Sequence, residues 1–266
     1  MKVAIIGAGN LGLSMAKGLA QSEKVDQLII TRRNISVLEE WAAKLDKVEL
    51  SQDNKVAVQK SDVLVIAVQP AQLNMLAEQI RGAIRNDHLV ISTMTGQSIE
   101  SLERALGQVP IVRSMPNTAA AVEKSMTCLS ANELAHDQMV KAKEILGVLG
   151  ETLVIEESLM QAATVVCASG IAFWMRLIRA TTQGAIQLGF DAPEAKQMAV
   201  QTCLGAASLL NEIGNHPEAE IDRVTTPKGC TIEGLNEMEH QGLSSALIKG
   251  LVTSYQKIED IKKSVL

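Results

Sequence analysis

The sequence of 266 residues has very few aromatic side chains: two tryptophans, one tyrosine and two phenylalanines. Proteins that recognise single-stranded nucleic acid stack the bases on aromatic rings, and this chain has too few rings for such a surface. Its core must be aliphatic, and 47% of its residues are hydrophobic. This composition is typical of a globular protein and excludes a disordered, collagen-like or coiled-coil chain.

The chain also lacks an excess of positive charge. It has 30 acidic and 25 basic residues, which gives a formal net charge of −5. A mildly acidic protein has no long-range field to hold nucleic acid or an anionic membrane, so we expect neither as a partner. The long apolar stretch 158–190 has only two charged residues, but polar residues and a glycine interrupt it. We therefore expect no membrane span.

Cysteine is scarce, and the four that occur are far apart in the sequence, with no pair at metal-ligand spacing. A chain of this length does not depend on disulfides, so we expect reduced thiols, no metal site and a cytoplasmic location. The apolar run at residues 3–6 is too short for a signal peptide. The histidines lie in polar contexts and are expected at the surface: His88, His136, His216 and His240.

The chain divides into two parts with different sequence patterns. Residues 1–155 alternate β-branched runs with helical patterns, which predicts a mostly parallel sheet with helices on both faces. The expected strands are 3–6, 28–30, 48–50, 63–68, 89–92, 111–113, 126–129 and 153–155, and the expected helices are 11–21, 35–44, 71–84 and 99–106. Residues 156–266 predict helices alone, at 158–188, 193–213, 232–239 and 243–263. We expect an α/β domain followed by an all-α domain.

The predicted helix 158–188 is apolar on nearly all sides. The remaining helices are too few to cover it alone, which makes a homodimer the expected assembly. Residues 156–266 would then form a dimerisation and substrate domain. The alternative is a central helix that its own neighbours wrap.

A glycine motif follows the first expected strand directly and opens a helix. It reads Gly7-Ala8-Gly9-Asn10-Leu11-Gly12 and has the form G-x-G-x-x-G. The glycines permit a tight turn and close approach of a pyrophosphate, which the free N–H groups of the helix then bind. Because strand, turn, helix and second strand occur in order, the motif predicts a Rossmann-type dinucleotide-binding domain at residues 1–155.

The end of the second expected strand indicates which dinucleotide is bound. An NAD-specific site has an acidic residue about 20 positions past the glycines. This chain has Arg32 and Arg33 there and no acid. Guanidinium groups bind a phosphate dianion that a carboxylate would repel, so we infer NADP(H) over NAD(H).

Three further segments narrow the interpretation. They are Val68-Gln69-Pro70, Arg113-Ser114-Met115-Pro116-Asn117-Thr118, and the late run from Val224 to Leu235 with the form T-x-P-x-G-x-T-x-x-G-L. In order and spacing they resemble the pyrroline-5-carboxylate reductase family. The resemblance implies NADPH-dependent reduction of a cyclic imine, 1-pyrroline-5-carboxylate, to proline, by a homodimer or larger homo-oligomer.

The resemblance assigns site residues to both halves of the chain. For the cofactor they are Gly7, Gly9, Asn10, Leu11, Gly12, Arg32, Asn54, Val68, Gln69 and Thr95. Gly229, Cys230 and Thr231 match the loop that holds the substrate carboxylate. The Thr231 hydroxyl matches the group that hydrogen-bonds the ring nitrogen, and its alternative role is a helix N-cap. The two roles of Thr231 are compatible. A hydroxyl is sufficient for the reaction, because an iminium is already electrophilic and needs orientation more than a strong acid.

The chain departs from the pattern of its relatives at several positions. Relatives usually have lysine where this chain has Gln69. They usually have the run S-G-S-G-P-A-Y at 167–173 and P-G-G at 227–229, where this chain differs at Ala168, Ile171 and Lys228 among others. Arg223 stands where relatives often have an amide. The departures leave the substrate open among cyclic imino acids. Two alternatives remain: another NADP-dependent dehydrogenase, disfavoured because 158–188 has no catalytic lysine, and a non-catalytic NADP-binding paralogue.

Overall fold

The computed structural model describes residues 1–265, with side chains described to residue 260. By internal contacts the chain forms two units, the first of residues 1–169 and 254–266 and the second of residues 170–253. This division falls later than the predicted boundary at residue 155. The functional division into 1–155 and 156–266 stays a prediction.

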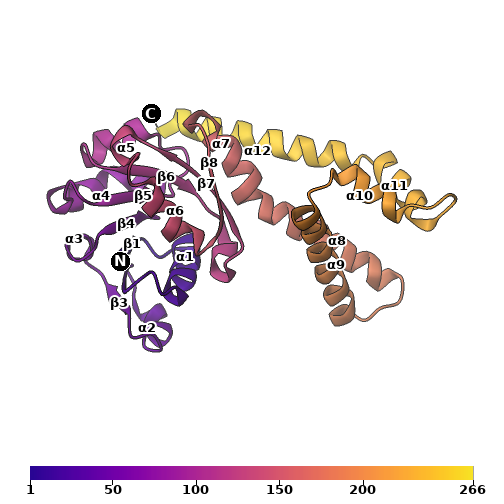
Figure 1. Cartoon of the computed structure of the whole chain (residues 1–266), viewed down its shortest axis with the longest axis horizontal. Helices are drawn as coiled ribbons and strands as arrows, with labels where there is room; N and C mark the ends of the chain where they lie inside the picture. Colours follow the sequence, from indigo (N-terminus) through magenta and orange to yellow (C-terminus); the bar gives the residue numbers. More distant parts are fainter. Residues whose placement is uncertain (266) are drawn as a thin grey trace. The chain divides into compact units, whose positions relative to one another are not determined.

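Unit 1 is built on one sheet of eight strands, in the order β3-β2-β1-β4-β5-β6-β7-β8 (Figure 1). The strands are β1 (Lys2–Ile6), β2 (Gln27–Thr31), β3 (Val48–Ser51), β4 (Val63–Ile66), β5 (Leu89–Ser92), β6 (Ile111–Met115), β7 (Ser125–Ala131) and β8 (Gly150–Val154). Adjacent strands from β3 to β6 are parallel, β7 is antiparallel to β6, and β8 is parallel to β7. The predicted mostly parallel Rossmann-type sheet is confirmed.

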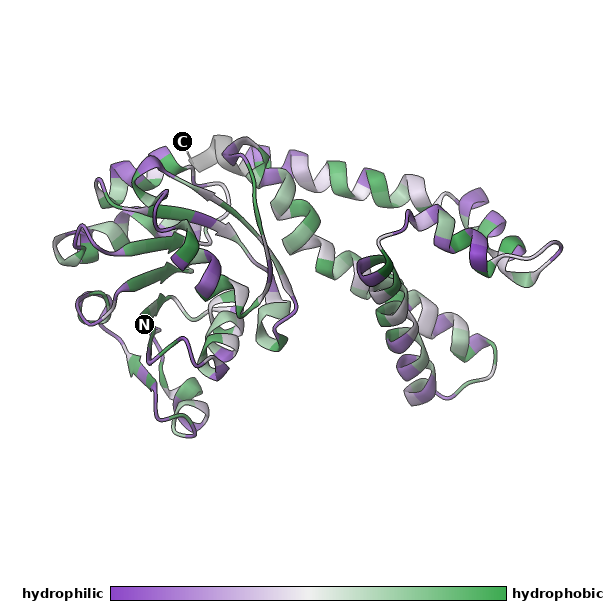
Figure 2. Ribbon diagram, viewed as in Figure 1, coloured by the Kyte–Doolittle hydropathy of each residue, from purple (hydrophilic) through white to green (hydrophobic). Residues whose placement is uncertain are grey.

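The two faces of the sheet are covered by different helices. Alternate strand residues face opposite sides, and Ile5 and Ile30 pack with α1 (Asn10–Gln21), α2 (Ser36–Ala42) and α6 (Met139–Gly147). Ile6 and Leu64 pack on the other face with α3 (Asn54–Gln59), α4 (Leu73–Ile80) and α5 (Ile99–Leu106). Figure 2 shows the strands as largely hydrophobic, as burial on both faces requires.

Helix α5 shows how local sequence sets the bounds of an element. Ser98 caps its start, because the Ser98 side chain accepts a hydrogen bond from the Ser101 N–H (3.1 Å). Glu100 lies in the first turn and Arg104 in the last, each placed favourably for the helix dipole. Gly107 ends the helix.

The predicted helix 158–188 is present but not uniform. A 3-10 turn (Glu157–Leu159) leads into α7 (Met160–Ala163), a π-helical segment (Thr164–Ser169) and α8 (Gly170–Gln187). In the described residues, Glu157–Gln187 is the one helix long and apolar enough to cross a membrane by length and composition, and 28% of its most apolar window is buried. Helices that pack against a neighbour have the same composition, so this feature is weak evidence of a span.

Unit 2 holds α8, α9 (Ala192–Ile213), α10 (Pro217–Val224), α11 (Cys230–His240) and the first part of α12 (Leu243–Val265). Ala195 and Ala199 are the buried residues of α9, which packs against α8. Many large apolar side chains of this unit are exposed in the single chain, including Trp174, Met175, Leu188 and Leu204. The surface is therefore suited to further packing.

One expectation about the histidines is wrong. His88 is completely buried, whereas it was expected at the surface. Its Nδ1 accepts a hydrogen bond from the Arg85 N–H (3.0 Å), and its Nε2 donates to the Ser61 carbonyl (3.0 Å). The ring thereby joins the turn before β5 to the turn before β4. The sequence does not reveal this burial, because His88 stands beside the polar residues Arg85 and Asp87.

Candidate functional site

The glycine motif forms a tight turn between β1 and α1. Gly7 has a φ of +98°, and a Cβ there would lie 2.7 Å from Cγ1 of Val68. The N–H groups of Gly7 and Ala8 donate to the Thr31 carbonyl (3.2 and 2.9 Å), which holds the turn against the end of β2. A side chain at Gly7 would therefore strain the backbone and collide with the loop after β4.

Gly9 is the N-cap of α1 and has no side chain to satisfy the first-turn N–H groups. A Cβ at Gly9 would meet no described atom within 4 Å. The predicted residues Asn10, Leu11 and Gly12 make up that first turn. Free N–H groups beside open space are what a pyrophosphate needs, so the turn fits a dinucleotide.

A cavity of about 660 Å3 opens beside the turn, at the carboxyl ends of β1, β2 and β4. Seven of the predicted cofactor residues line it: Gly7, Gly9, Arg32, Arg33, Asn54, Val68 and Gln69. It also has nine lining residues that the sequence analysis missed: Ala8, Thr31, Asn34, Gln52, Ala67, Gln72, Met75, Leu76 and Gln79. Ala8, Thr31, Asn34 and Ala67 adjoin a predicted residue in sequence. Met75, Leu76 and Gln79 lie on α4, which approaches the cavity.

The two arginines at the end of β2 differ in their surroundings. Nη1 of Arg32 donates to the Ala8 carbonyl (3.0 Å), so this half-buried side chain holds the glycine turn. Arg33 is exposed, and its carbonyl accepts from Nε2 of Gln52 (2.6 Å). Neither guanidinium forms an ion pair with a carboxylate of the described residues. Both charges are available to an anion in the cavity.

Asn54 and Gln69 lie at the start of helical segments. Nδ2 of Asn54 donates to Oε1 of Gln79 (2.9 Å), which links α3 to α4. Gln69 caps the 3-10 turn Pro70–Gln72, and its N–H donates to Oε1 of Gln72 (3.2 Å). Both side chains are thus placed by local contacts at the cavity wall.

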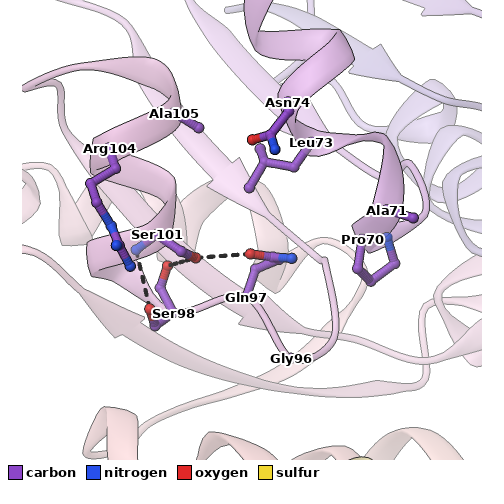
Figure 3. A pocket seen from close by; sticks show the side chains of 10 residues that line it. All are labelled: Pro70, Ala71, Leu73, Asn74, Gly96, Gln97, Ser98, Ser101, Arg104 and Ala105. Atoms are coloured by element: carbon purple, nitrogen blue, oxygen red, sulfur yellow. Dashed lines mark hydrogen bonds between the residues drawn. The ribbon is translucent and has the colours of Figure 1, made fainter. Parts of the chain in front are cut away.

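The structure does not place Thr95 in the cofactor cavity. Its neighbours Gly96, Gln97 and Ser98 instead line a second cavity of about 490 Å3, which lies between α5 on one side and the 3-10 turn Pro70–Gln72 and the start of α4 on the other (Figure 3). In that cavity the Ser101 hydroxyl lies 2.9 Å from Oε1 of Gln97 and 2.8 Å from the Ser98 carbonyl. These contacts fix the loop that follows Thr95.

Two residues of the Arg113–Thr118 segment tie the sheet to the long helix. Nη1 of buried Arg113 donates to Oε1 of Glu157 (2.7 Å), which also accepts from the Ile99 N–H (2.7 Å). Nδ2 of Asn117 donates to the Cys167 carbonyl in the π-helical segment (3.0 Å). The segment therefore sets the position of residues 157–169 in unit 1.

The predicted substrate loop lies in unit 2, before α11. The Gly229 N–H donates to the Thr226 carbonyl (2.9 Å), which closes a turn through Pro227 and Lys228. Lys228 has a φ of +58°, and proline followed by a left-handed residue is the pattern of a type II turn, where glycine is usual. Lysine at this position therefore carries backbone strain that glycine would not.

The N-cap of α11 is Gly229, so the alternative role of Thr231 as an N-cap is wrong. Cys230 and Thr231 occupy the first two helical positions, and their N–H groups are among those that a helix leaves free. Of the charged residues that depart from the family pattern, Arg223 pairs with Glu220 through Nη1 and Oε1 (2.8 Å). Lys228 is exposed and has no carboxylate within ion-pair distance among the described residues.

Both parts of the chain are similar to known protein families. A family model described as pyrroline-5-carboxylate reductase dimerisation matches residues 157–261, and one described as NADP oxidoreductase, coenzyme F420-dependent, matches residues 2–96. Pyrroline-5-carboxylate reductase 2 of Dictyostelium discoideum is 40% identical over 96% of this chain and 91% of its own length. The chain belongs to the pyrroline-5-carboxylate reductase family.

A second relative is pyrroline-5-carboxylate reductase 1 of Dictyostelium discoideum, which is 45% identical over 96% of this chain. The chain spans about half the length of that relative, 49%. The fold is shared with the pyrroline carboxylate reductase of Plasmodium falciparum, solved with NADP bound, at a TM-score of 0.89 and 20% identity over 98% of each chain.

Proposed function

We propose that the chain catalyses the reduction of 1-pyrroline-5-carboxylate to L-proline, with NADPH as the hydride donor. The observation that carries the proposal is the 40% identity to a named pyrroline-5-carboxylate reductase over 91% of that protein's length. The sequence features that led to the same activity, the glycine turn and the loop before α11, are both formed in the structure.

The cofactor cavity suits NADP(H). The N–H groups at the start of α1 would bind the pyrophosphate, and Arg32 and Arg33 would bind the 2′-phosphate. Gly9 leaves the space that the phosphates need, and Gly7 allows the tight turn against Val68. Asn54 would lie near the adenosine, and Val68 and Gln69 near the nicotinamide half, while Thr95 stays a prediction outside the cavity. The bound nicotinamide supplies the hydride.

The loop before α11 suits the substrate. The N–H groups of Cys230 and Thr231 would bind the carboxylate as a helix start binds other anions, and Gly229, whose own N–H closes the turn on Thr226, would hold the loop in place for it. The Thr231 hydroxyl would hydrogen-bond the ring nitrogen and orient the imine carbon. No strong acid is needed at this step, because a protonated imine is already electrophilic.

The exposed apolar surface of unit 2 supports assembly with a second copy. Trp174 is 59% exposed and Leu204 is 56% exposed in the single chain, and the dimerisation model covers both residues. Large apolar side chains gathered at a surface favour association. We propose a homodimer or a larger closed homo-oligomer, located in the cytoplasm, where the four free cysteines would stay reduced.

Consumption of NADPH tests the function directly. The purified chain at micromolar concentration is mixed with NADPH and one of a panel of cyclic imino acids that differ in ring size and in acidic substituents. We expect oxidation of NADPH with 1-pyrroline-5-carboxylate and formation of proline. NADPH binding without turnover of any imine would overturn the proposal and favour a non-catalytic paralogue. A preference for an imine with a second acidic group would assign Lys228 to specificity.

A further inference from the structure

Two of the four cysteines face each other inside unit 1. Cys128 lies in β7 and Cys167 in the π-helical segment, 39 residues later, and their Sγ atoms are 3.8 Å apart. Both are free thiols. The contact joins a strand of the sheet to the helical segment that leads into unit 2.

We propose that Cys128 and Cys167 are a modification site, at which a hydroperoxide converts the thiol pair to an intramolecular disulfide. The inference goes beyond the proposed reductase activity and does not depend on it. It rests on the distance between the thiols, on their surroundings and on the fixed position of the Cys167 backbone.

The surroundings of the pair are apolar and rich in sulfur. Cys128 is 3% exposed and packs in a cluster with Met115, Met160 and Ala163, and Cys167 packs against the same cluster. Burial raises the pKa of the Cys128 thiol to about 12, with the neighbouring Cys167 as the second cause. Cys128 therefore stays protonated and inert to an oxidant by itself. A disulfide is uncharged and suits this cluster better than a sulfinate does.

Cys167 is the residue that an oxidant would reach first, because it is only partly buried. Its thiolate attacks one oxygen of the peroxide; the O–O bond breaks, the sulfur is oxidised to a sulfenic acid, and hydroxide leaves with a proton to form water. The Cys128 sulfur then attacks the sulfenic sulfur. The S–O bond breaks, and the departing hydroxide takes the Cys128 proton. Two thiols and one hydrogen peroxide thus give one disulfide and two waters.

The backbone of Cys167 is already held in place for this step. Nδ2 of Asn117 donates to its carbonyl (3.0 Å), and Asn117 is itself fixed because its Oδ1 accepts from the Ala119 N–H (2.9 Å). The Sγ atoms then have to move from 3.8 Å to the S–S distance of about 2.05 Å. The asparagine contact keeps the two thiols opposed in the reduced protein.

The test is peptide mapping of the folded full chain after treatment with hydrogen peroxide, without reduction. We expect an intact mass lower by two hydrogen atoms, one peptide pair that links Cys128 to Cys167, and loss of that pair on treatment with dithiothreitol. The oxidised chain should also unfold at a higher temperature, because the cross-link constrains the unfolded state. Cys203→Ser is the matched control and should form the same link.

Two variants make the result decisive. Cys167→Ser and Cys128→Ala should each abolish the link, and the serine variant keeps the shape of the side chain if the alanine variant unfolds. Conversion of Cys167 to sulfinic acid while Cys128 remains a free thiol would overturn the proposal. Links found only at Cys203 or Cys230 between two chains would overturn it as well.

Discussion

At the scale of single residues, we expect Arg32 and Arg33 to differ in their roles toward the cofactor. Arg32 bonds the glycine turn through the Ala8 carbonyl, whereas Arg33 is exposed at the cavity wall. Replacement of both arginines by alanine should weaken the binding of NADPH by about 1–3 kcal/mol, which is the strength of a charge-assisted hydrogen bond to a phosphate. We expect the KM for NADPH to rise roughly 5- to 150-fold more than the KM for NADH.

Steady-state kinetics with each cofactor checks this expectation. Lys17→Ala, which removes an exposed positive charge from α1 away from the cavity, is the control and should leave both KM values unchanged. The single variant Arg33→Ala should act on NADPH alone, because Arg32 also supports the turn that both cofactors use. Equal effects of the double variant on NADPH and NADH would show that neither arginine reads the phosphate.

Thr231 is the residue that tests the substrate loop. Thr231→Val removes the hydroxyl and keeps the branched shape. A hydrogen bond to a charged group contributes about 1.5–3 kcal/mol, so kcat/KM for the imine should fall roughly 10- to 150-fold. Because Gly229 is the N-cap of α11, we expect little change in thermal stability.

Binding of NADPH, measured by fluorescence titration, should be the same in Thr231→Val and in the wild type. A variant that keeps wild-type kcat/KM would remove Thr231 from the site and leave the ring nitrogen to water or to another group.

At the scale of elements, the sequence predicted every strand to within a few residues. The central strands β1, β4 and β5 are runs of β-branched and aliphatic side chains, whereas β3, β7 and β8 include polar residues or glycine and gave weaker signals. Helix α5 was predicted at its observed bounds, since a serine cap and a glycine stop bracket it. Helices α3, α6 and α10 were missed. Helix α3 is six residues long and is positioned by the Asp53 side chain, which accepts from two N–H groups. Such a contact leaves no periodic pattern.

The sequence predicted the candidate site in part, as it did the helices. Residues that a motif fixes in sequence, such as Gly7 and Arg32, lie in the cavity as predicted. Gln79 and Met75 do not belong to a motif and reach the cavity only because α4 packs beside it. The π-helical segment is set by contacts such as that of Asn117 with Cys167, which the sequence does not display.

The buried side chain of His88, in the turn before β5, should make the stability of the fold depend on pH. Burial and the positive charge of Arg85 lower the pKa of His88 from its ordinary value of 6.5. The unfolded chain therefore binds a proton at a higher pH than the folded chain does. The free energy of unfolding should be fully maintained above about pH 6.5 and fall as the pH drops toward the lower folded pKa, by at most about 1.4 kcal/mol per pH unit.

Urea denaturation at pH values from 7.5 down to 5.5 measures this slope. In His88→Gln the slope should be lost, together with part of the stability at neutral pH, while His136→Gln, at an exposed position, should behave as the wild type. An unchanged slope in His88→Gln would assign the pH dependence to other groups.

At the scale of the whole molecule, the exposed apolar side chains of unit 2 predict the assembly. Trp174 lies on α8 and is 59% exposed. Trp174→Glu would place a charge in the proposed interface, and an unpaired buried charge is strongly unfavourable. We expect the wild type to sediment as a dimer or larger closed oligomer at micromolar concentration, and Trp174→Glu to dissociate.

Val140→Glu is the matched control, because Val140 is similarly exposed on α6 of unit 1. It should keep the assembly of the wild type. A monomeric wild type in sedimentation velocity would contradict the proposed interface as a whole.

The division of the chain has a consequence for the order of synthesis. Unit 1 is made of two pieces, and its second piece, from Ser254 onward, follows all of unit 2 in the sequence. Nε2 of Gln161 donates to the Tyr255 carbonyl (3.1 Å), and Tyr255 and Ile258 line a cavity with Arg113 and Glu157. The ribosome delivers these last contacts only after residues 170–253 have emerged. The nucleotide-binding fold can thus begin during translation, but the surface around Arg113 and Glu157 is completed only after unit 2 has been made.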